Sequence, residues 1–179
     1  MFTCQYCGTQ FTEHRSNCPN CGAAIQVDAK QAAKRSKSVS VLDDIRQICS
    51  QVQGLESVYF EDAIQPKRLA NVMAKFEIPA DEKVIFLYDD TVFNAKNDVG
   101  FAVCTRGLYW RNDWSVSTKR RHLTWDEFAK RDVNLDGLQI KLGFGDQIGV
   151  AGCGSDPVRE KLTFMLKDIQ RLFKSQTPA

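Results

Sequence analysis

The chain has 179 residues, 43% of them hydrophobic, and its 24 basic and 22 acidic side chains leave a formal net charge of +2. This length suits one ordinary domain with a small appendage, and the near balance of charge argues against a polyanion binder that uses its whole surface. The longest strongly apolar run, Val84 to Tyr88, is far shorter than the roughly 20 residues that span a bilayer. The first residues show neither the basic start nor the apolar stretch of a secretory signal, so we expect a cytoplasmic protein with reduced thiols.

Two copies of a Cys-x-x-Cys-Gly phrase open the sequence, and ten residues separate the two pairs. Two residues between paired cysteines let the chain turn back, so that both sulfurs face one point and four thiolates complete the tetrahedral shell of one Zn²⁺. The glycine after each second cysteine suits a position of positive φ. A shell of four thiolates leaves no place for water or substrate, so the sequence predicts one structural zinc ion. Its predicted ligands are Cys4, Cys7, Cys18 and Cys21.

Two other interpretations of these cysteines are disulfide bonds and a redox-active pair. A pair of disulfides is disfavoured by the expected reducing environment, and a redox Cys-x-x-Cys needs only one pair, inside a thioredoxin-like βαβ unit. His14 could replace a cysteine ligand, but four thiolates already fill the shell. Residues 1–25 resemble the short zinc ribbons at the start of many bacterial proteins. A segment of about 25 residues buries too little surface to fold alone, so we expect the metal to supply the missing stability.

A basic, alanine-containing stretch follows over residues 26–40, with almost no large apolar side chain. This composition is typical of a solvated linker. Lys34, Arg35 and Lys37 are its candidate binding residues, because clustered cations can contact phosphates or an acidic partner. A plain soluble spacer is the alternative.

Residues 41–80 predict a helical segment. Apolar residues recur every three or four positions over 41–53, and Gly54 suits the end of a helix. A second helix is predicted from Pro66 to Phe76, because proline fits a first helical turn. Cys49 lies on the apolar face of the first helix and is interpreted as a small buried hydrophobe.

From Val84 onward the sequence predicts about seven short antiparallel strands and then a helix. Asp136-Gly137 is the strongest hairpin signal in the chain. An amphipathic helix beginning at Asp156 offers one apolar stripe to the sheet. The expected strands lie at Val84–Asp90, Val99–Thr105, Gly107–Asn112, around Ser117–Trp125, and at Val133–Leu135, Leu138–Phe144 and Ile148–Val150.

The segments Tyr88–Thr91, Gly100–Thr105 and Gly107–Trp110 resemble motifs of bacterial pleckstrin-homology-like (PH-like) domains, and the likeness covers roughly residues 65–175. It implies an α+β fold, with a seven-stranded antiparallel PH-like barrel or sandwich over 81–179 capped by the C-terminal helix. It does not imply a ligand, because one barrel fold hosts unrelated functions.

A search for catalytic groups points to no enzyme. Asp89 and Asp90 are adjacent on a predicted strand, so their side chains point to opposite faces and cannot easily share a proton. Cys104 and His122 are a thiol and an imidazole with no sign in the sequence that they meet. The glycine-rich stretch 143–154 lacks the Gly-Lys-Ser/Thr ending of a phosphate-binding loop.

A second basic cluster holds Lys119, Arg120 and Arg121. It either protects an edge strand from aggregation or binds an acidic partner or phosphates. The sequence therefore predicts a non-catalytic zinc-binding adaptor that recognises a protein partner, with a nucleic-acid binder that uses the zinc ribbon and the basic linker as the alternative. A homo-oligomer is left open.

Overall fold

The structure is a computed structural model that describes residues 2–4, 6–11, 17–23, 41–90, 99–113 and 116–175. The chain divides into two compact units, residues 1–40 and residues 41–179. The predicted linker over 26–40, with Lys34, Arg35 and Lys37, lies outside the described residues, as does His14.

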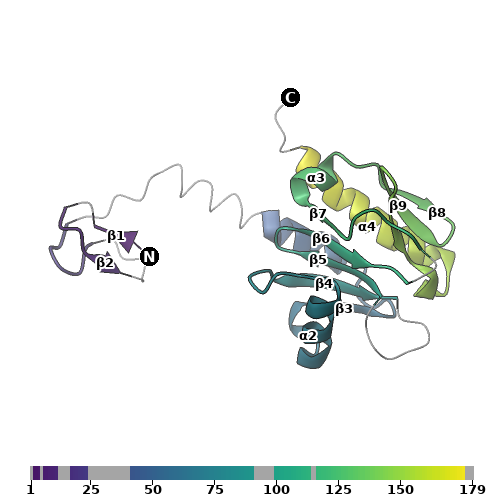
Figure 1. Ribbon diagram of the computed structural model, residues 1–179, viewed down its shortest axis with the longest axis horizontal. Helices are drawn as coiled ribbons and strands as arrows, with labels where there is room; N and C mark the ends of the chain where they lie inside the picture. The colour runs from purple at the N-terminus through teal and green to yellow at the C-terminus, as the bar shows by residue number, and fades with distance from the viewer. Residues whose placement is uncertain are drawn as a thin grey trace. The chain divides into compact units, whose positions relative to one another are not determined.

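The first unit contains a short antiparallel pair of strands, β1 (Phe2–Thr3) and β2 (Gln10–Phe11), shown in Figure 1. Phe2 pairs with Phe11 in this ladder. The hairpin encloses the first Cys-x-x-Cys pair.

The second unit is built on two antiparallel sheets, one of five strands and one of three. The strand pairings among the described residues close no barrel. The larger sheet has the order of the chain: β3 (Val58–Phe60), β4 (Val84–Asp89), β5 (Gly100–Cys104), β6 (Gly107–Arg111) and β7 (His122–Thr124). The smaller sheet contains β8 (Asn134–Asp136), β9 (Gln139–Gly143) and β10 (Asp146–Gly149).

The helical elements of this unit begin with a helix whose described part covers 41–50. The others are the 3₁₀ turns η1 (Glu61–Ala63) and η2 (Ala151–Cys153) and the helices α2 (Pro66–Lys75), α3 (Trp125–Ala129) and α4 (Asp156–Lys174). The three helices predicted from sequence are present. The first, predicted over 41–53, is helical only to residue 50, and α2 ends one residue earlier than expected.

Each of the seven predicted strands has a counterpart, but the described second unit has an eighth strand, β3. Its three residues are too few to show an alternating pattern, and all are half-buried. The strand predicted around Ser117–Trp125 is also shorter than expected. Only His122–Thr124 is extended, and the helix α3 follows at once.

Helix α3 begins with a capping box that the sequence prediction overlooked. The Thr124 hydroxyl accepts a hydrogen bond from the backbone N–H of Glu127, and the Glu127 carboxylate accepts one from the backbone N–H of Thr124. The spacing Thr-x-x-Glu is a known sign of a helix start. Here it ends strand β7 and turns the chain toward the smaller sheet.

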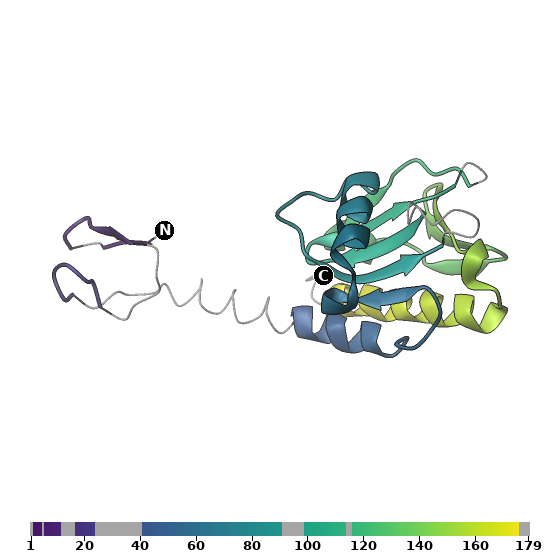
Figure 2. The same cartoon turned by 90° about the horizontal axis from the view of Figure 1, so that it is seen from below.

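The interior strands β4 and β5 of the larger sheet are buried on both faces, as the apolar run in β4 predicts. Successive residues of β5 alternate between two apolar clusters: Phe101 and Val103 join one, and Ala102 and Cys104 join the other. Helix α2 covers one face of this sheet, whereas α4 and the helix at 41–50 lie on the opposite face (Figure 2).

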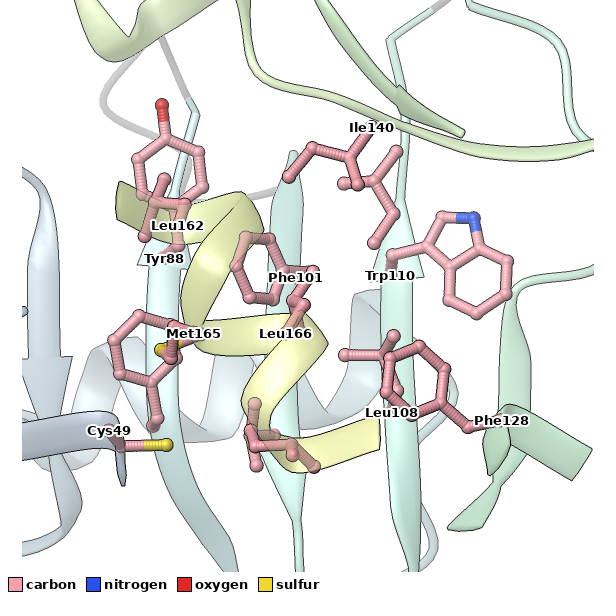
Figure 3. Packing of buried hydrophobic residues seen from close by; sticks show 14 of the residues in the cluster. Cys49, Tyr88, Phe101, Leu108, Trp110, Phe128, Ile140, Leu162, Met165 and Leu166 are labelled. Atoms are coloured by element: carbon pink, nitrogen blue, oxygen red, sulfur yellow. The ribbon is translucent and has the colours of Figure 1, made fainter. Parts of the chain in front are cut away.

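Figure 3 shows the main core, where Phe101, Leu108 and Trp110 of the larger sheet meet Leu166 of α4 and Ile140 of β9. The helix at 41–50 contributes Ile45 and Cys49 to the same core, both with no exposed surface. Cys49 is thus a small buried hydrophobe, as predicted, and burial raises the pKa of its thiol to about 12. The segment 41–80 packs on the sheets as part of the second unit.

Candidate metal centre

The two Cys-x-x-Cys segments form two turns with the same hydrogen bonds. In the first, the N–H of Cys4 donates to the carbonyl of Thr9, and the N–H of Gly8 donates to the carbonyl of Cys4. In the second, Cys18 and Gly22 repeat this pattern at the same spacing. Gly8 and Gly22 have φ values of 70° and 68°, a conformation that glycine adopts without a Cβ clash. The repeated phrase in the sequence therefore produces a repeated backbone turn.

These turns bring the four sulfurs into one cluster. Cys4 Sγ lies 3.7 Å from Cys21 Sγ, and Cys7 Sγ lies 3.6 Å from Cys18 Sγ. All four sulfurs lie within 4.8 Å of one another. With Zn–S bonds of about 2.3 Å, two ligands of a tetrahedral zinc are separated by about 3.8 Å. The cluster can hold one metal ion, and its dimensions fit zinc.

Disulfides do not account for this cluster. All seven cysteines are free thiols, and the contacts of 3.6 and 3.7 Å are much longer than an S–S bond of about 2.05 Å. Each of these contacts joins a sulfur of one Cys-x-x-Cys segment to a sulfur of the other, as a shared metal requires.

Two polar residues that the sequence prediction overlooked surround Cys7. Its sulfur lies 3.2 Å from the Thr9 hydroxyl, and the Asn20 amide of the second turn donates to the sulfur at 3.8 Å and to Thr9 Oγ1 at 3.1 Å. The side chain and the backbone of Thr9 lower the pKa of Cys7 to about 6. Such hydrogen bonds favour a thiolate, the form of cysteine that binds a metal.

The pKa of the Cys21 thiol indicates that the four sulfurs need a cation between them to ionise together. A hydrogen bond from the backbone of Ala23 lowers the pKa of the Cys21 thiol, but contacts with Cys7 and the other thiols, together with desolvation, raise it to about 12. Adjacent thiols cannot all ionise beside one another unless a positive charge lies between them. A metal ion supplies that charge, and its binding releases protons.

Asp89 and Asp90, the adjacent carboxylates considered in the search for catalytic groups, contact different partners. Asp90 is buried, and its Oδ1 accepts hydrogen bonds from the Tyr88 hydroxyl and the Gly152 N–H, both at 2.6 Å. Burial raises the pKa of Asp90 to about 6. Asp89 instead lies 4.0 Å from the Arg68 guanidinium. The contacts of Asp89 with Arg68 and of Asp90 with Tyr88 and Gly152 join the two carboxylates to different parts of the fold.

Cys104 and His122 also lie in different surroundings. Cys104 is fully buried against the α2 side of the larger sheet, and burial raises the pKa of its thiol well above the usual range. His122 is exposed and stacks on the Tyr109 ring, with centroids 4.7 Å apart.

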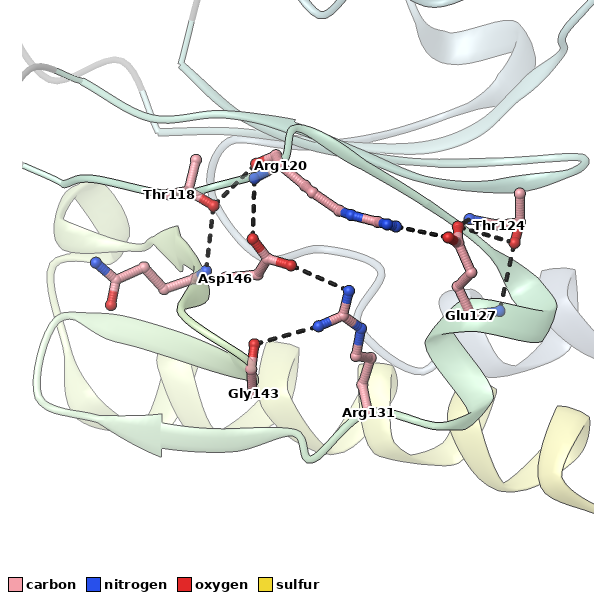
Figure 4. Close-up of polar contacts among 8 residues, drawn as sticks. Thr118, Arg120, Thr124, Glu127, Arg131, Gly143 and Asp146 are labelled. Carbon is pink, nitrogen blue, oxygen red and sulfur yellow. Dashed lines mark hydrogen bonds and ion pairs between the residues drawn. The ribbon is translucent and has the colours of Figure 1, made fainter.

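The basic cluster Lys119, Arg120 and Arg121 lies in the irregular segment before β7. Arg120 pairs with Glu127 (Figure 4), and Arg121 lies 3.5 Å from Glu77. These residues therefore do not alternate along an edge strand.

No helix in the described part of the chain is long and apolar enough to cross a membrane. No protein-family model, curated protein or solved structure matches this chain.

Proposed function

We propose that this chain is a non-catalytic zinc-binding adaptor, located in the cytoplasm, that recognises a protein partner. The observation that carries the proposal is the cluster of four sulfurs, with contacts of 3.6 and 3.7 Å between the two Cys-x-x-Cys segments. A four-thiolate shell holds a metal for structure because it leaves no coordination position for water or substrate. Cys4, Cys7, Cys18 and Cys21 would hold the ion.

The second unit is proposed to be a PH-like domain, with which the zinc ribbon would share the task of recognition. Support comes from two antiparallel sheets followed by the amphipathic helix α4, whose buried stripe includes Leu162, Leu166 and Ile169. The structure departs from the PH-like pattern because its strands form separate sheets of five and three strands instead of a closed barrel.

The absence of a catalytic role is likewise a proposal. It is supported by the contacts of Asp89 with Arg68 and of Asp90 with Tyr88, and by the full burial of Cys104, which raises the pKa of its thiol. General acid–base and nucleophilic catalysis both need reactive groups that lie within hydrogen-bond reach of one another.

The adaptor function is tested by affinity capture from native cytoplasmic extract with the zinc-loaded chain. We expect at least one protein to be retained after nuclease digestion and to be lost with Cys4→Ser/Cys18→Ser, because the double variant cannot hold the metal. Cys153→Ser, which changes a thiol outside the cluster, is the matched control and should retain the same protein.

A steep loss of retention with salt, together with complete loss after nuclease digestion, would instead indicate a nucleic-acid binder. That outcome would contradict the adaptor proposal and would direct attention to Lys34, Arg35 and Lys37.

A further inference from the structure

An open groove of about 460 Å³ lies beside the turn between β9 and β10. The segment that precedes β7, the end of α3 and this turn supply its lining. The lining contains four basic side chains, two acidic side chains and one aromatic ring: Lys119, Arg120, Lys130, Arg131, Glu127, Asp146 and Phe144.

Both carboxylates of the groove are already paired. Asp146 and Arg131 form an ion pair at 3.1 Å, and their side chains are only 2% and 8% exposed. The Asp146 carboxylate also accepts the backbone N–H of Arg120, and Arg131 donates to the carbonyl of Gly143. This network, drawn in Figure 4, ties the turn to the segment before β7 and gives the groove a fixed floor.

Two cations are therefore in excess. Glu127 is paired with Arg120, whereas Lys119 and Lys130 are exposed and form no ion pair with any carboxylate of the described residues. The groove therefore presents two ammonium groups that form no ion pair in the described part of the second unit, so an acidic ligand complements it.

Phe144 is the unusual residue of this groove. It is 77% exposed, the most exposed of the large hydrophobic side chains described. It also has a φ of 55°, followed by 86° at Gly145, in a two-residue hairpin turn that favours Asn-Gly. A bulky side chain is strained in this conformation. Its ring lies 5.0 Å from the Arg131 guanidinium, which holds it at the groove.

We infer that this groove binds an acidic peptide segment of a partner protein, with Phe144 packing against an apolar or aromatic residue of that segment. The inference rests on the proposed adaptor function and names a binding surface for it. Lys119 and Lys130 would contact carboxylates on either side of the apolar residue. An exposed aromatic ring beside a few cations is typical of protein recognition.

This surface differs from the basic cluster predicted from the sequence. Lys119 and Arg120 line the groove, but Arg121 faces a neighbouring depression with Glu77 and His122. Lys130, Arg131 and Phe144 join the groove from positions 9 to 23 residues after Arg121 in the sequence. The cluster Lys119 to Arg121 is therefore divided between two surfaces.

The test uses a random peptide library displayed on phage and selected against the full zinc-loaded chain. We expect enrichment of peptides in which acidic residues flank an apolar or aromatic residue. Labelled copies of the selected peptides are then titrated with variants by fluorescence anisotropy. Phe144→Asn and Lys119→Glu/Lys130→Glu should each weaken binding at least tenfold, while Phe164→Ser and Lys161→Glu, which change an exposed phenylalanine and an exposed lysine elsewhere, should not.

Phe144→Asn also separates binding from folding. Asparagine is favoured in this turn, so the variant should melt at the same or a higher temperature than the original chain while losing the peptide. The groove lies wholly in the second unit, so a selected peptide should still bind after chelation of the metal. Failure of the zinc proposal and failure of the groove proposal are thereby distinguished.

Two results would overturn the inference. One is a selection that yields no acidic peptides, or one whose selected peptides bind the Phe144→Asn variant as tightly as they bind the original chain. The other is that no acidic peptide is selected, whereas a single-stranded oligonucleotide binds the original chain and does not bind the lysine variants. That result would make the groove a phosphate site.

Discussion

Removal of the metal with a strong chelator should unfold residues 2–23 and leave residues 41–175 folded. The described part of the first unit consists of the two-residue strands β1 and β2 and the two hydrogen-bonded cysteine turns, and its buried hydrophobic residues are Cys4 and Cys18. Segments this small bury too little apolar surface to fold alone. Structural zinc contributes on the order of 10 kcal/mol in comparable small modules, so its loss removes most of the stability.

The measurement is a pair of amide ¹H–¹⁵N correlation spectra, with and without chelator. We expect the signals of the first unit to collapse to random-coil positions while those of the second unit stay in place. Cys18→Ser should reproduce the chelated spectrum, whereas Cys153→Ser should not, because Cys153 lies outside the sulfur cluster. Unchanged signals for residues 2–23 after complete metal removal would show that the metal does not hold this unit.

Gly100→Ala should destabilise the second unit by about 3 kcal/mol or more, in the range of severe backbone strain and steric overlap. Gly100 begins β5 opposite Asp89 and has a φ of 131°. A Cβ at this position would lie 2.1 Å from the carbonyl oxygen of Tyr88, which is backbone and cannot move aside. The pairing between β4 and β5, which are interior strands of the sheet, would have to open at this point.

Gly137→Ala is the matched control for this substitution. Gly137 also has a positive φ, 57°, but a Cβ there meets no atom within 4 Å. Its cost should be limited to the conformational strain of about 1 kcal/mol. Urea denaturation followed by tryptophan fluorescence measures both losses. Equal losses at the two positions would show that the close approach at Gly100 does not govern the stability of the sheet.

Local sequence signals predicted much of this structure. Cysteine spacing indicated the sulfur cluster because both turns are formed by residues close in sequence. Asp136-Gly137 predicted the β8–β9 hairpin, whose register pairs Asp136 with Gln139. The apolar stripe of α4 predicted its buried face, and Leu162 and Leu166 lie in the core as expected.

Features that depend on distant pairings were missed. Strand β3 exists because Val58 pairs with Tyr88, 30 residues further along the chain, and three residues give no pattern of their own. The groove at Phe144 depends on the Arg131–Asp146 ion pair and on its connection to Arg120. No spacing in the sequence specifies these contacts. The open arrangement of two sheets follows from similar long-range pairings.

Metal analysis of the gently purified chain, combined with zinc X-ray absorption, tests the central claim most directly. The account predicts one zinc ion per chain with four sulfur neighbours at about 2.3 Å. A chain without zinc, or sulfurs of Cys4, Cys7, Cys18 and Cys21 joined to one another, would contradict it.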